Sequence, residues 1–169
     1  MTQITISSLF GELTIFEVQG KIVCLKWGPG QKGPSNAQPT KVLLEAASQL
    51  KAYFVKALKR FDLPLSPLGT NFQRKVSCQM LNIPFGKTQT YGEIARRLKT
   101  SARAVGNACG HNTIPIIVPC HRVVSASGIG GYSGHGGQNT KLRLLKLEGV
   151  NTYISKQYNL IQPRKKNYA

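Results

Sequence analysis

Apolar positions divide the first half of the chain into a short β region and a helix. Residues 13–18 and 21–27 are rich in β-branched and aromatic residues, which favours two strands. Gln19-Gly20 between them is typical of a hairpin turn. From 41 to 61 the apolar residues recur at helical spacing, and Thr40 precedes them as a good N-cap. The pattern predicts a β-hairpin followed by a long helix.

Helical spacing dominates the second half. Residues 72–81 predict a short amphipathic helix that stops before Pro84. Thr90 and Glu93 fit a capping box for a helix over 90–98, and Ser101 can cap another over 102–109. Two short helices joined by a tight polar turn are typical of a helix-turn-helix. A basic helix over 140–148 should end at Gly149.

A β-branched apolar run over 114–118 predicts a buried strand that Pro119 ends. Cys120 would then lie where a rigid element gives way to a turn. A free cysteine in such a run can be a small core residue. It can also be a nucleophile, because the adjacent His121 offers an imidazole that could activate the thiol. Sequence spacing leaves both interpretations open.

The charge of the chain says more about its function than its overall composition does. The 169 residues carry 23 Lys and Arg against 6 Asp and Glu, a net charge of +17. Beyond Asp62 the only acids are Glu93 and Glu148, so this region suits contact with a polyanion such as nucleic acid. A solvated basic surface is the alternative. Glu148 at a helix C-terminus opposes the helix dipole, so its position calls for a specific partner.

Neither a membrane span nor a signal peptide is expected from the apolar runs and the first residues. The four cysteines lie far apart without a paired pattern, which favours reduced thiols and a bacterial-type cytoplasm. A zinc site in the first half would need ligands besides Cys24, and no histidine lies there.

The predicted helix over 102–109 has a face of small residues. Ala102, Ala104, Gly106 and Ala108 leave Arg103 as the one long side chain. Small residues permit close approach to a minor groove, where one arginine can enter the base stack. They can equally pack the helix against a neighbour, and the residues alone do not decide.

Several segments resemble the alkylguanine-DNA alkyltransferases, also called methylated-DNA–protein-cysteine methyltransferases. Residues 119–123 (PCHRV) are similar to the active-site signature of that family, 101–106 (SARAVG) to its recognition helix, and 132–134 (YSG) to its pocket loop. The approach over 61–73 is also similar, and the resemblance covers most of 61–149. Ser77 departs from the tryptophan that many members carry, and the loop around Gly131 and His135 is slightly longer than in some.

The resemblance implies a mixed α/β (α+β) chain. Residues 1–62 would form a ribonuclease-H-like structural domain with a small sheet and a helix, and 63–71 a linker. Residues 72–150 would form a mostly helical DNA-binding and alkyl-transfer domain with the helix-turn-helix and a short active-site strand. From its own composition, the segment 151–169 is expected to be a basic, disordered tail.

The resemblance also assigns roles to individual residues. Glu148 would orient His121, His121 would act through a water on the nucleophile Cys120, and Asn112 would tie the helix pair to the active-site turn. Tyr91 would rotate the target phosphate and protonate the leaving guanine. Contacts to DNA would come from Arg103, Tyr91, Gln73, Thr100 and Ala102. The base pocket would be lined by Cys109, Pro115, Val123, Tyr132 and Ser133.

The function implied is DNA repair by a single irreversible transfer of an alkyl group from guanine O6 to Cys120, after minor-groove binding and base flipping. No cofactor or metal is expected, and the partner would be double-stranded DNA containing O6-alkylguanine, bound by a monomer. Three alternatives are a cysteine hydrolase, a nonenzymatic alkylated-DNA sensor or DNA-binding regulator of the same fold, and a metal site. The metal site would use Cys109, His111, Cys120 and His121.

Overall fold

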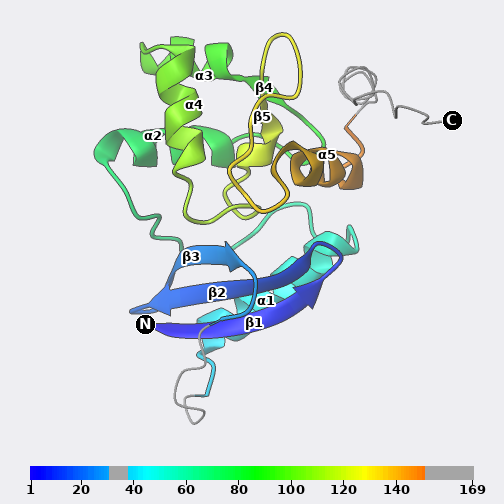
Figure 1. Ribbon diagram of the computed structural model, residues 1–169. Helices are drawn as coiled ribbons and strands as arrows, with labels where there is room; N and C mark the ends of the chain where they lie inside the picture. Colours follow the sequence, from blue (N-terminus) through cyan, green and yellow to red (C-terminus); the bar gives the residue numbers. More distant parts are fainter. Residues whose placement is uncertain (31–37, 151–169) are drawn as a thin grey trace, which may run out of the picture.

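The computed structural model describes residues 1–30 and 38–150. Its first element is an antiparallel sheet in the order β1-β2-β3, with strands Thr2–Ser8, Gly11–Val18 and Lys21–Trp27. Helix α1 (Lys41–Phe54) packs on this sheet, and the remaining helices lie beyond the β3 edge of the sheet (Figure 1). The predicted hairpin is confirmed, with Gln19 and Gly20 both at positive φ. Strand β1 was not predicted, because Ile4 and Ile6 are the only strong alternating positions in a polar segment.

Helix α1 begins after the Thr40 cap as predicted, but the prediction that it runs to residue 61 is wrong. Its last helical residue is Phe54, and Lys56 adopts a left-handed φ of 61°. This turn redirects the chain so that Leu58 and Phe61 pack against the core from outside the helix. Tertiary packing therefore outweighs the helical periodicity of this segment.

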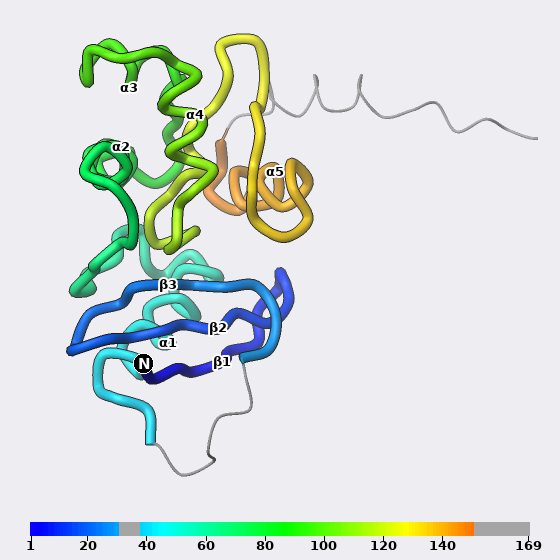
Figure 2. The backbone as a smooth tube through the Cα atoms, turned by 60° about the vertical axis from the view of Figure 1, so that its left-hand side comes forward, coloured from blue at the N-terminus to red at the C-terminus, as the bar shows by residue number. Residues whose placement is uncertain are grey.

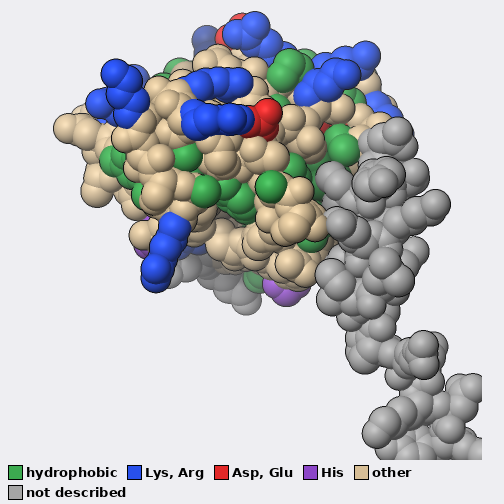
Figure 3. Space-filling model, turned by 90° about the horizontal axis from the view of Figure 1, so that it is seen from above, with side chains coloured by type: hydrophobic (Ala, Val, Ile, Leu, Met, Phe, Trp, Pro, Cys, Tyr) green, Lys and Arg blue, Asp and Glu red, His purple; other side chains and the backbone are tan. Residues whose placement is uncertain are grey.

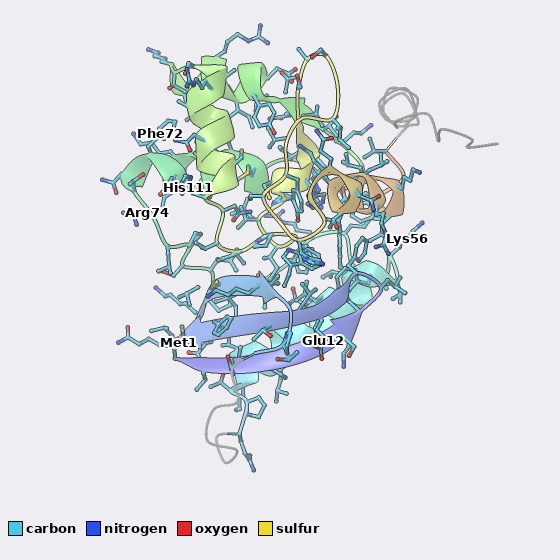
Figure 4. All side chains as sticks on the ribbon, viewed as in Figure 1. Met1, Glu12, Lys56, Phe72, Arg74 and His111 are labelled. Atoms are coloured by element: carbon cyan, nitrogen blue, oxygen red, sulfur yellow. The ribbon has the colours of Figure 1, made fainter. Side chains whose placement is uncertain are left out.

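The segment predicted as a linker lies against the sheet. Ile22 N–H donates to Pro64 O at 2.8 Å, and Ser66 N–H donates to Ile22 O at 2.8 Å. One apolar cluster includes buried residues of the sheet, of α1 and of the later helices. Figure 4 shows side chains filling the space between the sheet and these helices. The division of the chain into domains at 63–71 stays a prediction, and the predicted tail lies outside the described residues.

The second half contains α2 (Asn71–Leu81), α3 (Tyr91–Leu98), α4 (Ala102–Gly110) and α5 (Gly137–Leu147). Predicted caps are confirmed at Thr90, which forms a capping box with Glu93, and at Ser101. Lys99 takes a left-handed conformation at the end of α3 and reverses the chain into α4. Helices α3 and α4 pack together as the predicted helix-turn-helix, and Figure 2 shows this pair beside α2 and away from the sheet.

The buried strand predicted over 114–118 is not formed. The run is buried as expected, but Ile116 has φ 73° and Val118 N–H bonds back to Ile114 O. Prolines at 115 and 119 remove two donors, which disfavours a regular ladder. The short strand of this region is instead β5 (Val123–Val124), which pairs in parallel with β4 (Gln89–Thr90). It follows the cysteine rather than preceding it.

No helix within residues 1–30 and 38–150 combines the length and the apolar character that a membrane crossing requires.

Candidate active site

Cys120 opens a short 3₁₀ turn, Cys120–Arg122, whose three residues are buried. Asn112 shapes the approach to this turn from the end of α4. Its Nδ2 donates to Val118 O at 2.8 Å, and its Oδ1 accepts from Ile114 N–H at 3.1 Å. The Asn112 side chain thus links the helix-turn-helix to the turn that carries the thiol.

A cavity of about 270 Å³ opens beside Cys120. It lies between the second helix of the pair and the loop that precedes α5. The lining residues are Tyr91, Gly106, Cys109, Gly110, Cys120, Gly131, Tyr132 and Ser133. Three of the five residues expected in a base pocket therefore line it: Cys109, Tyr132 and Ser133. Pro115 and Val123 are buried but are not among the lining residues.

His121, the residue after Cys120, belongs to a buried polar cluster that centres on Glu148. His121 Nε2 lies 2.6 Å from Glu148 Oε1, and both side chains have no exposed surface. The Arg122 guanidinium makes a bidentate contact with the same carboxylate: Nε lies 2.9 Å from Oε2, and Nη2 lies 3.0 Å from Oε1. Gly86 N–H donates to Oε2 at 3.1 Å. The partner that Glu148 needs at its C-cap position is thus this pair of basic side chains.

His121 is set up as a base. Burial lowers its pKa, and this outweighs the opposing effect of Glu148, so the imidazole is neutral near neutral pH. With Nε2–H donating to Glu148, the proton-free nitrogen is Nδ1. Nδ1 is buried and has no hydrogen-bond partner among the described residues. A neutral imidazole held in one tautomer, with an unsatisfied acceptor, suits proton removal from a nearby group.

Opposing effects act on the Cys120 thiol. Burial raises its pKa above the ordinary value, and the Asn112 side chain and the charge of Lys141 offset only part of this rise. Lys141 itself has no exposed surface, and burial lowers its pKa to about 8. Its Nζ donates to Val123 O at 2.5 Å and to Gly131 O at 2.9 Å. An ammonium held here offsets part of the cost of forming the buried thiolate.

Tyr91 closes another side of the cavity. Burial raises its pKa to about 12, so its hydroxyl stays protonated near neutral pH and can donate a proton. The hydroxyl lies 3.4 Å from Gly131 O and 3.5 Å from Lys141 Nζ. The Tyr132 hydroxyl is also buried and finds no partner within residues 1–30 and 38–150.

The residues expected to contact DNA lie on α2 and on the helix pair. Arg103 and Ala102 are exposed at the start of α4, and Thr100 is half-buried in the turn before it. Figure 3 looks down on this end of the molecule and shows more Lys and Arg than acidic side chains there. Gln73 lies in the first turn of α2, where its Oε1 accepts from Thr70 N–H in a capping box.

Three residues of the site were missed by the sequence analysis: Tyr53, Arg122 and Lys141. Lys141 and Arg122 are basic residues, which are usually found at the surface. Tyr53 lies among apolar residues at helical spacing, so it is expected to be an ordinary core residue. The scarcity of acids was the available signal, because a buried Glu148 requires a buried cation.

The four residues of the alternative metal site do not converge. His111 is exposed, with Nδ1 2.8 Å from Asn107 O, while His121 is directed to Glu148. In the part of the chain that the structure describes, no three His, Cys, Asp or Glu side chains are placed to hold a metal ion.

Acid should destabilise the fold through Glu148. Burial raises the pKa of Glu148, but His121 and Arg122 lower it by a larger amount. The net pKa is about 2, against the ordinary 4.5. A depressed pKa contributes stability that is complete above the unfolded value and is lost as the pH falls toward 2. We expect a loss of roughly 2–3 kcal/mol of unfolding free energy on acidification, measured by urea titration at several pH values.

The control for this prediction is a matched pair of amide variants. Glu148→Gln should lack most of the acid-dependent change, whereas Glu45→Gln, at an exposed position of α1, should keep it. An unchanged acid dependence in Glu148→Gln would contradict the prediction.

The chain is similar to known proteins of one family. Residues 71–150 match the family described as "6-O-methylguanine DNA methyltransferase, DNA binding domain". The chain is 53% identical over 106 residues to a methylated-DNA–protein-cysteine methyltransferase of Mycobacterium tuberculosis, and 51% identical over 108 residues to one of Methanosarcina acetivorans. These alignments cover 61% and 62% of this chain, and 63% and 68% of the relatives.

Solved structures match over a larger share. The crystal structure of Mycobacterium tuberculosis OGT in complex with DNA superposes with a TM-score of 0.75 at 42% identity, covering 87% of this chain and 92% of that one. An O6-methylguanine DNA methyltransferase from Methanococcus jannaschii gives a TM-score of 0.66 at 30% identity, covering 89% and 94%.

Proposed function

The chain belongs to the methylated-DNA–protein-cysteine methyltransferase family, and on that premise we propose that it repairs DNA by moving an alkyl group from guanine O6 to its own Cys120. The observation that carries the proposal is that Cys120 lies in the wall of a cavity and is followed by a buried His121, whose Nε2 lies 2.6 Å from Glu148 Oε1. A thiol so placed can be activated from one side and meet a substrate on the other.

The proposed reaction is a direct displacement. His121 Nδ1 takes the Cys120 proton through one water molecule, and the thiolate attacks the alkyl carbon on guanine O6. The sulfur–carbon bond forms as the carbon–oxygen bond breaks, and the electron pair passes to the guanine. A proton from the Tyr91 hydroxyl makes the leaving guanine neutral. The product is a thioether on Cys120, which has no ready return path, so each chain acts once.

The substrate base must leave the helix to reach the cavity. An atom inside a duplex is inaccessible to a buried thiol, so the nucleotide has to be flipped out. The small side chains of α4 allow a close approach to the minor groove, and Arg103 would take the place of the flipped base. Ala102, Thr100, Gln73 and Tyr91 would contact the DNA backbone around it. Binding of this kind requires little sequence preference.

Within the cavity, Ser133 would hydrogen-bond the guanine oxygen and Tyr132 would form one wall. The partner is therefore double-stranded DNA with O6-alkylguanine, and we propose that one chain acts as a monomer, since the cavity and the polar cluster come from a single chain. The reaction needs no cofactor. All cysteines of the chain are unpaired, which supports a reducing, cytoplasmic setting. The alternative of a nonenzymatic sensor is disfavoured because a nucleophile stands at residue 120.

The test is to mix the protein with duplex DNA containing O6-methylguanine and to weigh its peptides. We expect one added methyl per chain on the peptide that contains Cys120, with saturation and no turnover. Cys109→Ala is the matched control, because it removes the other thiol of the cavity, and it should still take up the methyl. Cys120→Ser should take up none. DNA binding with an unmodified Cys120 would favour the sensor instead.

A further inference from the structure

Tyr53 brings the N-terminal half of the chain into the polar cluster. It lies on α1 with no exposed surface, and its hydroxyl donates to Glu148 Oε1 at 2.7 Å. The same hydroxyl lies 3.4 Å from His121 Nε2. Tyr53 and Glu148 are 95 positions apart in the sequence, so this contact joins the first helix to the last.

The two oxygens of Glu148 are held differently. Gly86 N–H and the Arg122 guanidinium hold Oε2, while Tyr53 and His121 share Oε1, which Arg122 Nη2 also contacts. The Tyr53 hydroxyl therefore helps to determine where Oε1 lies, and Oε1 is the atom that orients the imidazole. Burial and the nearby carboxylate raise the pKa of Tyr53 well above its ordinary value, so the hydroxyl remains a donor.

The ring of Tyr53 is fixed by other aromatic side chains. Ring centroids lie 5.5 Å away for Phe54, 5.3 Å for Phe61 and 6.0 Å for Phe85. These neighbours come from α1, from the segment after it and from the loop before β4, so the hydroxyl cannot move without repacking all three. A phenylalanine would keep this packing and remove a single hydrogen bond.

We propose that Tyr53 is a positioning residue for alkyl transfer: its hydroxyl holds Glu148 Oε1 where that oxygen orients His121 toward Cys120. The inference rests on the proposed function and adds a role for the N-terminal half of the chain. Tyr53 does not line the cavity, so it acts on the reaction only through Glu148 and His121.

The experiment compares Tyr53→Phe with Thr14→Val in the full-length chain. Thr14 is a matched control, because its buried hydroxyl donates to Gly28 O at 2.8 Å within the N-terminal sheet. With duplex DNA containing O6-methylguanine, Tyr53→Phe should slow transfer about tenfold, the order expected for one hydrogen bond to a charged group. Both variants should reach one methyl per chain, and Thr14→Val should keep the original rate.

A second substitution separates positioning from a general structural effect. In a His121→Gln background, Tyr53→Phe should change the remaining rate less than about twofold, because the group through which it acts is gone. NMR of the Tyr53→Phe chain alone gives an independent reading: the His121 ring resonances should shift, and they should not shift in Thr14→Val.

An equal slowing by Tyr53→Phe in both backgrounds would overturn the inference, as would unchanged His121 resonances. If the original chain and Tyr53→Phe transfer the methyl group at the same rate, the inference is overturned and the proposed function still stands. Absence of transfer by the original chain would overturn the proposed function itself.

Discussion

Replacing Arg122 with leucine is expected to lower the free energy of unfolding by roughly 3–5 kcal/mol, the usual cost of removing one partner of a buried ion pair. Arg122 makes three contacts with Glu148 and donates from Nη1 to Ile83 O at 2.6 Å. Leucine would leave the Ile83 carbonyl without this donor and the Glu148 charge without its cation. Urea unfolding monitored by circular dichroism measures the change.

Two variants serve as comparisons for the Arg122 prediction. Arg122→Lys keeps the charge but loses the bidentate contact with the carboxylate, so it should lower the free energy of unfolding by less than Arg122→Leu does. Arg96→Leu changes an exposed arginine on α3 and should alter stability by less than about 0.5 kcal/mol. A loss below about 1 kcal/mol in Arg122→Leu would contradict a structural role for the buried pair.

The helix caps and the hairpin turn could be predicted from the sequence, because they depend on neighbouring residues. Thr90, Ser101 and Thr40 were identified as caps, and all three side chains accept from the third residue of their helix. A cap depends on residues three positions apart, so it needs no knowledge of the tertiary structure. The Gln19-Gly20 turn was predictable for the same reason.

Elements that depend on distant packing were predicted less well. The apolar run before Cys120 was recognised as buried, but a buried turn and a buried strand have the same composition. The end of α1 was misplaced because Lys56 leaves the helix so that later residues can reach the core. In both cases the deciding contacts come from other elements of the chain.

The candidate site likewise has residues that the local sequence predicted and residues that only distant contacts reveal. Cys120, His121 and Glu148 were found through a short motif and through the scarcity of acids. Tyr53 and Lys141 were missed, because their role depends on neighbours that are 95 and 18 positions away. A tyrosine on an apolar helix face is ordinary in a sequence, and it becomes informative only when its hydroxyl is seen to meet a carboxylate.

Replacing Arg103 with alanine is expected to slow alkyl transfer from duplex DNA about 100-fold. Extruding a base costs a few kcal/mol, and the proposed arginine offsets that cost by filling the gap. Arg103 is exposed on α4, next to Ala102, so no packing should be lost. The measurement is the rate of methyl transfer to Cys120 under conditions where each chain reacts once.

The free alkylated base gives the decisive comparison, because it needs no extrusion. With free O6-alkylguanine, Arg103→Ala should react within about twofold of the original rate, since the thiol, His121 and the cavity are unchanged. Arg103→Lys keeps the charge but lacks a planar group to stack between bases, so it should recover DNA affinity more than rate. An equal loss on both substrates would place the defect in the cavity, and an unchanged rate on duplex DNA would contradict a role for Arg103 in extrusion.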